Sequence, residues 1–129
     1  MPITALYAGL LALVLLVLSA RVIGVRRAEK ISLGDGDNRD LLASIRAHAN
    51  FTEYTPMALI LMGLAESMKS SSLLLHGLGI ALVAGRVAHA YALSQKPHVM
   101  ALRVGGMVAT LTVIGIAAAL CLMQGVLRT

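Results

Sequence analysis

Four long apolar stretches follow one another along this chain, with short polar segments between them. Residues 2–20 and 104–127 contain no Asp, Glu, Lys or Arg. Each is long enough to cross about 30 Å of hydrocarbon as a helix. Two interior stretches, near 41–68 and 70–93, are apolar but interrupted by Arg46, Glu53, Glu66, His76, Arg86 and His89. The pattern predicts an all-α integral membrane protein, a bundle of four transmembrane helices that forms one domain over residues 1–129.

Turn and cap signals predict where these helices end. The first helix is expected to end near Gly24, and the second to begin between Asp37 and Asp40, where Asp or Asn can cap it. Lys96-Pro97 is expected to end the third helix. Close helix contacts are expected at small residues, and the candidates are Gly9, Gly63 and Gly106.

Composition supports the membrane interpretation. Hydrophobic residues make up 58% of the chain and charged residues 13%, and the mean hydropathy of +0.84 lies beyond that of an ordinary soluble domain. The first stretch could also be a cleaved signal peptide. No Lys or Arg precedes it, however, whereas Arg21, Arg26, Arg27 and Lys30 follow it, so an uncleaved anchor is predicted.

The distribution of charge predicts an orientation. The formal net charge is +5, which could indicate nucleic-acid binding, but the basic residues are concentrated in the first and third connections. With four spans these connections share one side, which would hold Arg21, Arg26, Arg27, Lys30, Arg39, Lys96 and Arg103. By the positive-inside rule this side is cytoplasmic and both termini lie outside. The excess charge is therefore assigned to topology, and no nucleic-acid partner is expected.

A polar face interrupts the second apolar stretch. Arg46, Asn50 and Glu53 are spaced by four and three residues, so they share one side of a helix. Ionisable residues in a membrane helix cost roughly 2.5 to 3.5 kcal/mol each, so they are retained where they pair or face a polar cavity. The polar face is therefore the first candidate for a functional site.

The third stretch carries a second polar group, in which Arg86 and His89 share a helical face. Both are predicted to lie at the depth of the polar face and of Arg103, in one layer near the cytoplasmic surface. Pairing of Arg86 with a buried Glu53 solely to hold the helices in register is one interpretation. The excess of arginines over glutamate favours the other, in which the layer binds an anionic ligand.

These residues carry a family resemblance. The strings Arg46-Ala47-His48-Ala49-Asn50-Phe51-Thr52-Glu53-Tyr54 and Gly85-Arg86-Val87-Ala88-His89, with four predicted spans, resemble the MAPEG family, the membrane-associated proteins of eicosanoid and glutathione metabolism. The resemblance covers essentially the whole chain. Its loop glycines and Gly105-Gly106-Met107 are most similar to the uncharacterised bacterial branch, which implies a bacterial inner membrane.

The resemblance implies a homotrimer that binds glutathione in a cleft between subunits, open to the cytoplasmic side. Glu53 would meet the amino group of glutathione, and arginines would meet its carboxylates. Arg103 matches the arginine that stabilises the thiolate and is the predicted catalytic residue. The implied binding residues are Arg26, Arg46, Asn50, Glu53, Tyr54, Arg86 and His89, and Arg27 is the alternative to Arg26.

Two functions remain open from the sequence. One is a glutathione-dependent transferase or isomerase that acts on lipophilic electrophiles reaching the site from the membrane. The other is a non-catalytic lipid-binding or scaffold protein. The second is favoured by two departures from the family pattern, because Leu93 stands where family enzymes have a tyrosine and Val104 follows Arg103 in place of a hydroxyl residue. A small multidrug exporter is disfavoured, since the first helix has no carboxylate.

Overall fold

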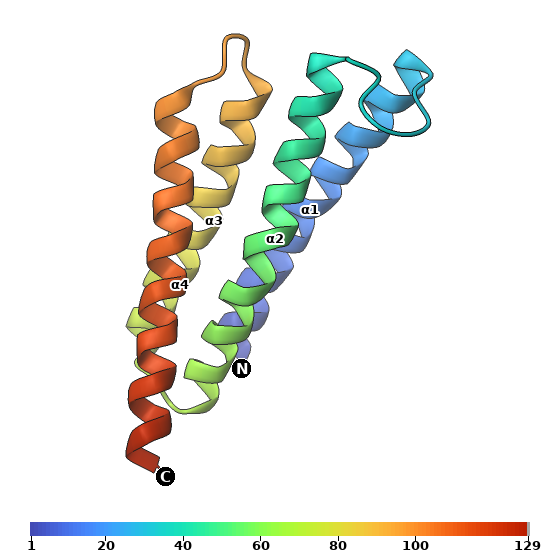
Figure 1. Cartoon of the computed structure of the whole chain (residues 1–129). Coiled ribbons are helices and arrows are strands. Elements are labelled where there is room, and N and C mark those ends of the chain that lie inside the picture. The colour runs from blue at the N-terminus through green and yellow to red at the C-terminus, as the bar shows by residue number, and fades with distance from the viewer. Residues whose placement is uncertain (129) are drawn as a thin grey trace.

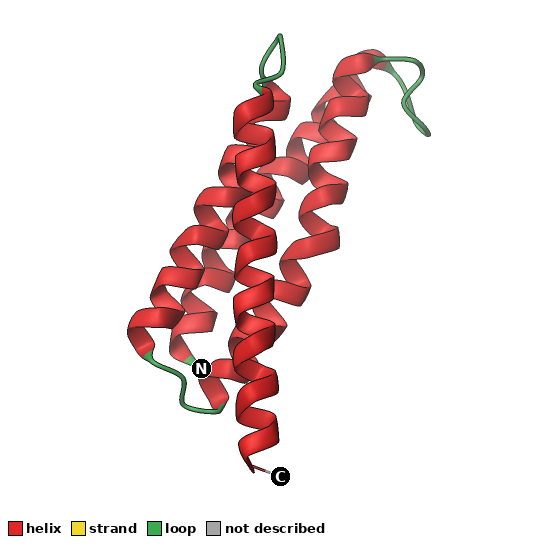
Figure 2. Cartoon of the chain, turned by 60° about the vertical axis from the view of Figure 1, so that its left-hand side comes forward, coloured by secondary structure: helices red, strands yellow, loops and turns green. Residues whose placement is uncertain are grey.

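The computed structural model describes residues 1–128 and contains four long helices. They run alternately up and down, so that two helical hairpins pack side by side (Figure 1). Short connections join the helices at both ends of the bundle (Figure 2). The prediction of an all-α, four-helix fold is confirmed. The helices are α1 (Pro2–Glu29), α2 (Arg39–Ser67), α3 (Ser72–Ser94) and α4 (Met100–Arg128).

The predicted end of the first helix is wrong. α1 continues past Gly24 to Glu29 and closes at Lys30, whose φ is 56°. A glycine inside a helix costs about 1 kcal/mol relative to alanine, which the helix-favouring residues that follow can offset. The predicted start of α2 is confirmed, because Asn38 accepts hydrogen bonds from the amides of Asp40 and Leu41, both at 3.0 Å.

The first turn of α1 is capped from another helix. No side chain within α1 caps this end. Instead the carboxylate of Glu66, in the last turn of α2, accepts hydrogen bonds from the amides of Ile3 at 3.0 Å and Thr4 at 2.8 Å. A negative charge at a helix N-terminus is also favoured by the helix dipole. Glu66 therefore ties the two arms of the first hairpin together at their ends.

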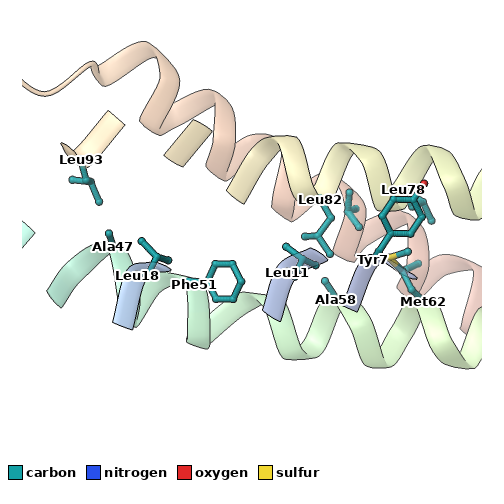
Figure 3. Packing of buried hydrophobic residues seen from close by; sticks show 12 residues of the cluster. Tyr7, Leu11, Leu18, Ala47, Phe51, Ala58, Met62, Leu78, Leu82 and Leu93 are labelled. Atoms are coloured by element: carbon teal, nitrogen blue, oxygen red, sulfur yellow. The ribbon is translucent and has the colours of Figure 1, made fainter. Parts of the chain in front are cut away.

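The interior is apolar and narrow, and the outer surface is apolar as well. Leu11, Phe51 and Leu82 are among the buried residues that all four helices contribute to one cluster (Figure 3). Large apolar side chains such as Leu13 and Leu16 point outward, with 61% and 65% of their surface exposed. A surface of this kind is suited to hydrocarbon rather than to water.

The helices do not form a symmetrical square. α2 and α3 each contact the three other helices, whereas α1 and α4 do not touch one another within the described residues. At the end that holds the α1–α2 and α3–α4 connections, the two hairpins diverge (Figure 1). The polar residues predicted to form a site belong to this half of the molecule.

Three of the helices, α1, α3 and α4, are long and apolar enough to cross a membrane. α2 is long enough but not apolar enough, because charged residues recur along it. These are Arg39, Asp40, Arg46, Glu53 and Glu66. α2 therefore differs from the apolar span that was predicted, because its charged outer face needs protein or water beside it.

Small residues bring α3 and α4 into close contact. A Cβ atom added at Gly106 would lie 2.4 Å from the carbonyl oxygen of Gly85 and 2.9 Å from the amide nitrogen of His89. The predicted contact at Gly106 is therefore confirmed. Gly63 faces the Met1 side chain, whereas Gly9 has no neighbour within 4 Å and its predicted contact is wrong for the single chain.

Candidate functional site

The site is built around a fully buried arginine. Arg86 in α3 is 1% exposed, and its Nη1 donates a 2.7 Å hydrogen bond to the Oδ1 atom of Asn50 in α2. The same nitrogen is 3.4 Å from the Asn50 carbonyl oxygen, and Nη2 is 3.7 Å from the sulfur of Met107 in α4. Arg86 thus joins three helices, and the predicted common depth of Asn50 and Arg86 is confirmed.

The hydrogen bonds of this arginine are incomplete. Its Nε atom is buried and has no partner within the described residues. Asn50 donates its own side-chain N–H to Met107, a weak acceptor, over 3.7 Å. The buried guanidinium of Arg86 keeps its positive charge and has one unpaired donor. It therefore creates a positive potential inside the bundle, next to Asn50.

The salt bridge between Arg86 and Glu53, which was the structural alternative from the sequence, is not formed. Glu53 is exposed in the single chain, as is Arg46, and neither makes a hydrogen bond or ion pair with another described residue. The interpretation in which a buried Glu53 pairs with Arg86 is therefore wrong, and Asn50 is the partner. Asn50 faces the bundle, whereas Arg46 and Glu53 lie on the side of α2 that faces away from it.

His89 and Arg103 continue the layer towards α4. His89 is buried beside Gly106, at the close contact between α3 and α4. Arg103 is exposed in the first turn of α4. Arg86 and His89 are both buried on α3, three residues apart, and Gly106, which lies against His89, follows Arg103 by three residues in α4.

The remaining predicted residues lie nearby or on the connection. Tyr54 is half-buried on α2, one turn beyond Asn50. Arg26 instead donates to the carbonyl oxygens of Gly34 at 2.8 Å and Ile31 at 3.4 Å, which orders the α1–α2 connection. Arg27 is exposed. In the single chain, therefore, neither arginine contacts the other site residues.

The sequence analysis missed two contributors. Met107 lies between Asn50 and Arg86, but a methionine in an apolar helix ordinarily signals only packing. An ion pair between Lys96 and Asp40 connects the α3–α4 connection to the start of α2. Opposite charges near two helix ends could have suggested this pair, although the sequence does not indicate how closely those ends approach.

The pattern of exposed cations and a recessed arginine can be compared with known proteins. A family model, described as the MAPEG family, matches residues 4–123. The match spans all four helices and includes every residue of the polar layer. The chain belongs to the MAPEG family.

Two curated relatives of this MAPEG protein bear the same name, "Inner membrane protein YecN". They come from Escherichia coli strain K12 and from strain CFT073, and each is 37% identical over 94 residues. The alignment covers 73% of this chain and 72% of the relative. Together with the three apolar helices, these matches confirm the predicted integral membrane location, in the inner membrane.

Proposed function

We propose that this MAPEG protein is a membrane-embedded, glutathione-dependent transferase or isomerase that acts on lipophilic electrophiles. The thiol tripeptide would bind between subunits of a homotrimer, at the polar layer, in a cleft open to the cytoplasmic side. The observation that carries the proposal is the outward position of Arg46 and Glu53 on α2, the helix whose half-buried Asn50 holds the buried Arg86.

An outward pair of charges is costly for a chain that is alone in lipid. Each of Arg46 and Glu53 would cost roughly 2.5 to 3.5 kcal/mol in the centre of a membrane helix. The helix that carries them is also the one that is not apolar enough to span by itself. A second subunit packed against this face, with a polar ligand between the two, removes this cost, so the outward charges support both the trimer and the site.

The residues present fit the charges of glutathione. Glutathione has two carboxylates and one ammonium group, and the layer supplies Arg46, Arg86 and Arg103 for the first and Glu53 for the second. Arg86 is buried behind its hydrogen bond to Asn50, so in this proposal it contributes positive potential to the anionic ligand through Asn50. Arginine suits carboxylates because its planar guanidinium can donate two parallel hydrogen bonds.

Arg103 has a separate role in this proposal. Bound glutathione supplies a thiol, which is a strong nucleophile only when ionised. A guanidinium keeps its charge at any accessible pH, so Arg103 favours the thiolate over the thiol. Its exposed position at the head of α4 leaves it accessible to a ligand that also contacts α2. The apolar outer surfaces of the helices would admit an electrophile dissolved in the membrane.

Binding of glutathione to the detergent-purified protein tests the proposal directly. Titration calorimetry should show binding by the native chain and a loss of at least about thirtyfold in Glu53→Gln, because an ammonium group would lose its partner in a desolvated cleft. Glu29→Gln, at an exposed acid outside the predicted site, should bind as the native chain does. Absence of binding by the native chain would overturn the proposal.

A second candidate function is a non-catalytic lipid-binding or scaffold role in the same family. It is favoured by Leu93, which stands at the family's tyrosine position and is buried in the apolar core at 5% exposure. No hydroxyl is therefore available from that position. Glutathione binding without a thiolate signal and without conjugation of an aromatic electrophile would favour this candidate.

A further inference from the structure

A groove on the outer surface between α1 and α3 belongs to no part of the proposed glutathione site. It encloses about 270 Å³. α1, α2 and α3 contact one another in pairs, and α2 contributes no residue to the groove, which therefore lies on the side away from α2. The polar layer and the outward charges of α2 point elsewhere. The groove is lined by residues that include Val14, Val17, Arg21, Val87, Tyr91 and Ser94.

The groove is apolar along its length and cationic at one end. Arg21 is half-buried and makes no hydrogen bond or ion pair with any described residue. It lies at the level of Tyr91 and Ser94, in the last turn of α3, so it marks the end that the positive-inside rule places near the cytoplasmic surface. An arginine held against apolar side chains without a partner calls for an anion from outside the chain.

Tyr91 strengthens this interpretation. It is 52% exposed and lines the groove together with Arg21. Tyrosine is enriched at the boundary between hydrocarbon and headgroups, where its ring is apolar and its hydroxyl is solvated. Arg21 and Tyr91 together therefore place the polar end of the groove at headgroup depth.

We propose that this groove binds one phospholipid of the cytoplasmic leaflet with an anionic headgroup. Its phosphate would meet the Arg21 guanidinium, near the Tyr91 hydroxyl, and one acyl chain would lie along Val17 and Val87 towards the membrane centre. A single cation at one end of an otherwise apolar groove matches an amphiphile with one charged end. Basic pockets between transmembrane helices on the cytoplasmic side are known to bind such headgroups.

The membrane itself favours a lipid over other occupants. α1 and α3 are both apolar enough to span the bilayer, and the lining of the groove between them is mostly apolar, which suits contact with lipid. A second copy of the chain is the other possible occupant, but the face that needs covering by protein is the charged face of α2. The lipid proposal does not depend on glutathione binding and can fail separately from it.

Native mass spectrometry with added lipid tests the proposal. Protein in a mild detergent should retain phosphatidylglycerol in preference to phosphatidylethanolamine. Arg21→Gln should weaken retention of phosphatidylglycerol at least about tenfold, because hydrogen bonds to a charged group are lost. Arg27→Gln, an exposed cation on the same helix that does not line the groove, should weaken it by less than about fivefold.

Two further variants separate the parts of the groove. Arg21→Lys, which keeps the charge, should retain more phosphatidylglycerol than Arg21→Gln. Val87→Trp should reduce retention although Arg21 is intact, because the indole fills the space of the acyl chain. Equal losses in Arg21→Gln and Arg27→Gln would overturn the proposal, as would a change in subunit number rather than lipid retention in Arg21→Gln.

Discussion

The buried guanidinium of Arg86 dominates the site at the scale of single residues. It is held mainly by the side chain of Asn50, and its longer contacts are to the Asn50 carbonyl oxygen and a methionine sulfur. Taking a charge out of water costs several kcal/mol unless partners replace the lost hydration. Asn50 is therefore expected to stabilise the fold as well as to shape the site.

We expect Asn50→Ala to lower the free energy of unfolding by about 1.5 to 3 kcal/mol, the typical value of a hydrogen bond to a charged group. The double variant Asn50→Ala with Arg86→Met should be more stable than Asn50→Ala alone, because no unpaired charge remains buried. Thermal unfolding in detergent measures both. Thr52→Ala is the control, since the Thr52 hydroxyl is exposed and donates only to carbonyl oxygens of its own helix.

Arg103 provides a prediction about chemistry. Arg103→Leu should leave glutathione affinity within a few fold but abolish the ultraviolet thiolate absorbance that the native protein shows with saturating glutathione at neutral pH. The reason is that a fixed positive charge stabilises the ionised thiol selectively, which affects the reacting state more than binding. Arg103→Lys should keep part of the signal. An undiminished signal in Arg103→Leu would remove this residue from the mechanism.

The polar residues were largely predictable from the sequence, but their partners were not. Arg46, Asn50 and Glu53 follow a helical spacing that can be found in the sequence, and the common depth of Asn50 and Arg86 follows from the order of the helices, but their hydrogen bond does not. The exposure of Glu53 could not be predicted, because the orientation of a helix about its axis depends on packing. The spacing of three polar residues along one helix does not determine how that helix packs against its neighbours.

At the scale of helices, the contact between α3 and α4 depends on the absence of side chains. Gly106 in α4 lies against backbone atoms of Gly85 and His89 in α3, and a Cβ atom there would overlap them. Without water to drive apolar association, membrane helices associate through close packing of this kind. The same contact holds His89 in the site.

Gly106→Ala should therefore separate α3 from α4 and cost about 1 to 3 kcal/mol, the usual penalty of overpacking. Gly105→Ala is a matched control, because a Cβ atom at Gly105 has no neighbour within 4 Å. The control should be neutral, or stabilising by up to about 1 kcal/mol through helix propensity. The melting temperatures of the two variants in one detergent decide the matter, and equal destabilisation would contradict the prediction.

Helix boundaries show the limits of sequence reasoning at this scale. The α2 start was found because Asn38 offers a local cap. The α1 end was placed too early at Gly24, since glycine is a weak stop when the connection beyond it folds back. Arg26 donates to the carbonyl of Gly34, a contact between the last turn of α1 and the connection that the sequence did not reveal.

At the scale of the whole molecule, charged residues lie on one side of the bundle, and this predicts that copies of the chain assemble along that side. Three helices are apolar enough for lipid and α2 is not, so one side of the bundle is unsuited to the membrane. Copies of the chain that meet along this side would bury Arg46 and Glu53 together with ligand or water. The all-α membrane fold could be predicted from the length of the apolar stretches alone. The uneven distribution of charge around the bundle became visible only once the packing of the helices was known.

We expect native mass spectrometry of the detergent-solubilised protein to give three times the 13.5 kDa chain mass. Arg46→Leu combined with Glu53→Leu should weaken specific assembly, because the polar complementarity of the face is removed. Leu13→Ala is a control, since Leu13 lies on the outer apolar surface of α1. A monomer from the native sequence under the same conditions would exclude a site between subunits.

The cap that Glu66 provides for α1 has a consequence for how the chain is made. The amides of Ile3 and Thr4 emerge from the ribosome more than sixty residues before the carboxylate that satisfies them. Until the end of α2 has crossed to the same side of the bilayer, the first turn of α1 has no acceptor in the protein. Water at the end of the bundle can accept these hydrogen bonds in the meantime, so the cap joins the ends of the first two helices only after α2 is complete.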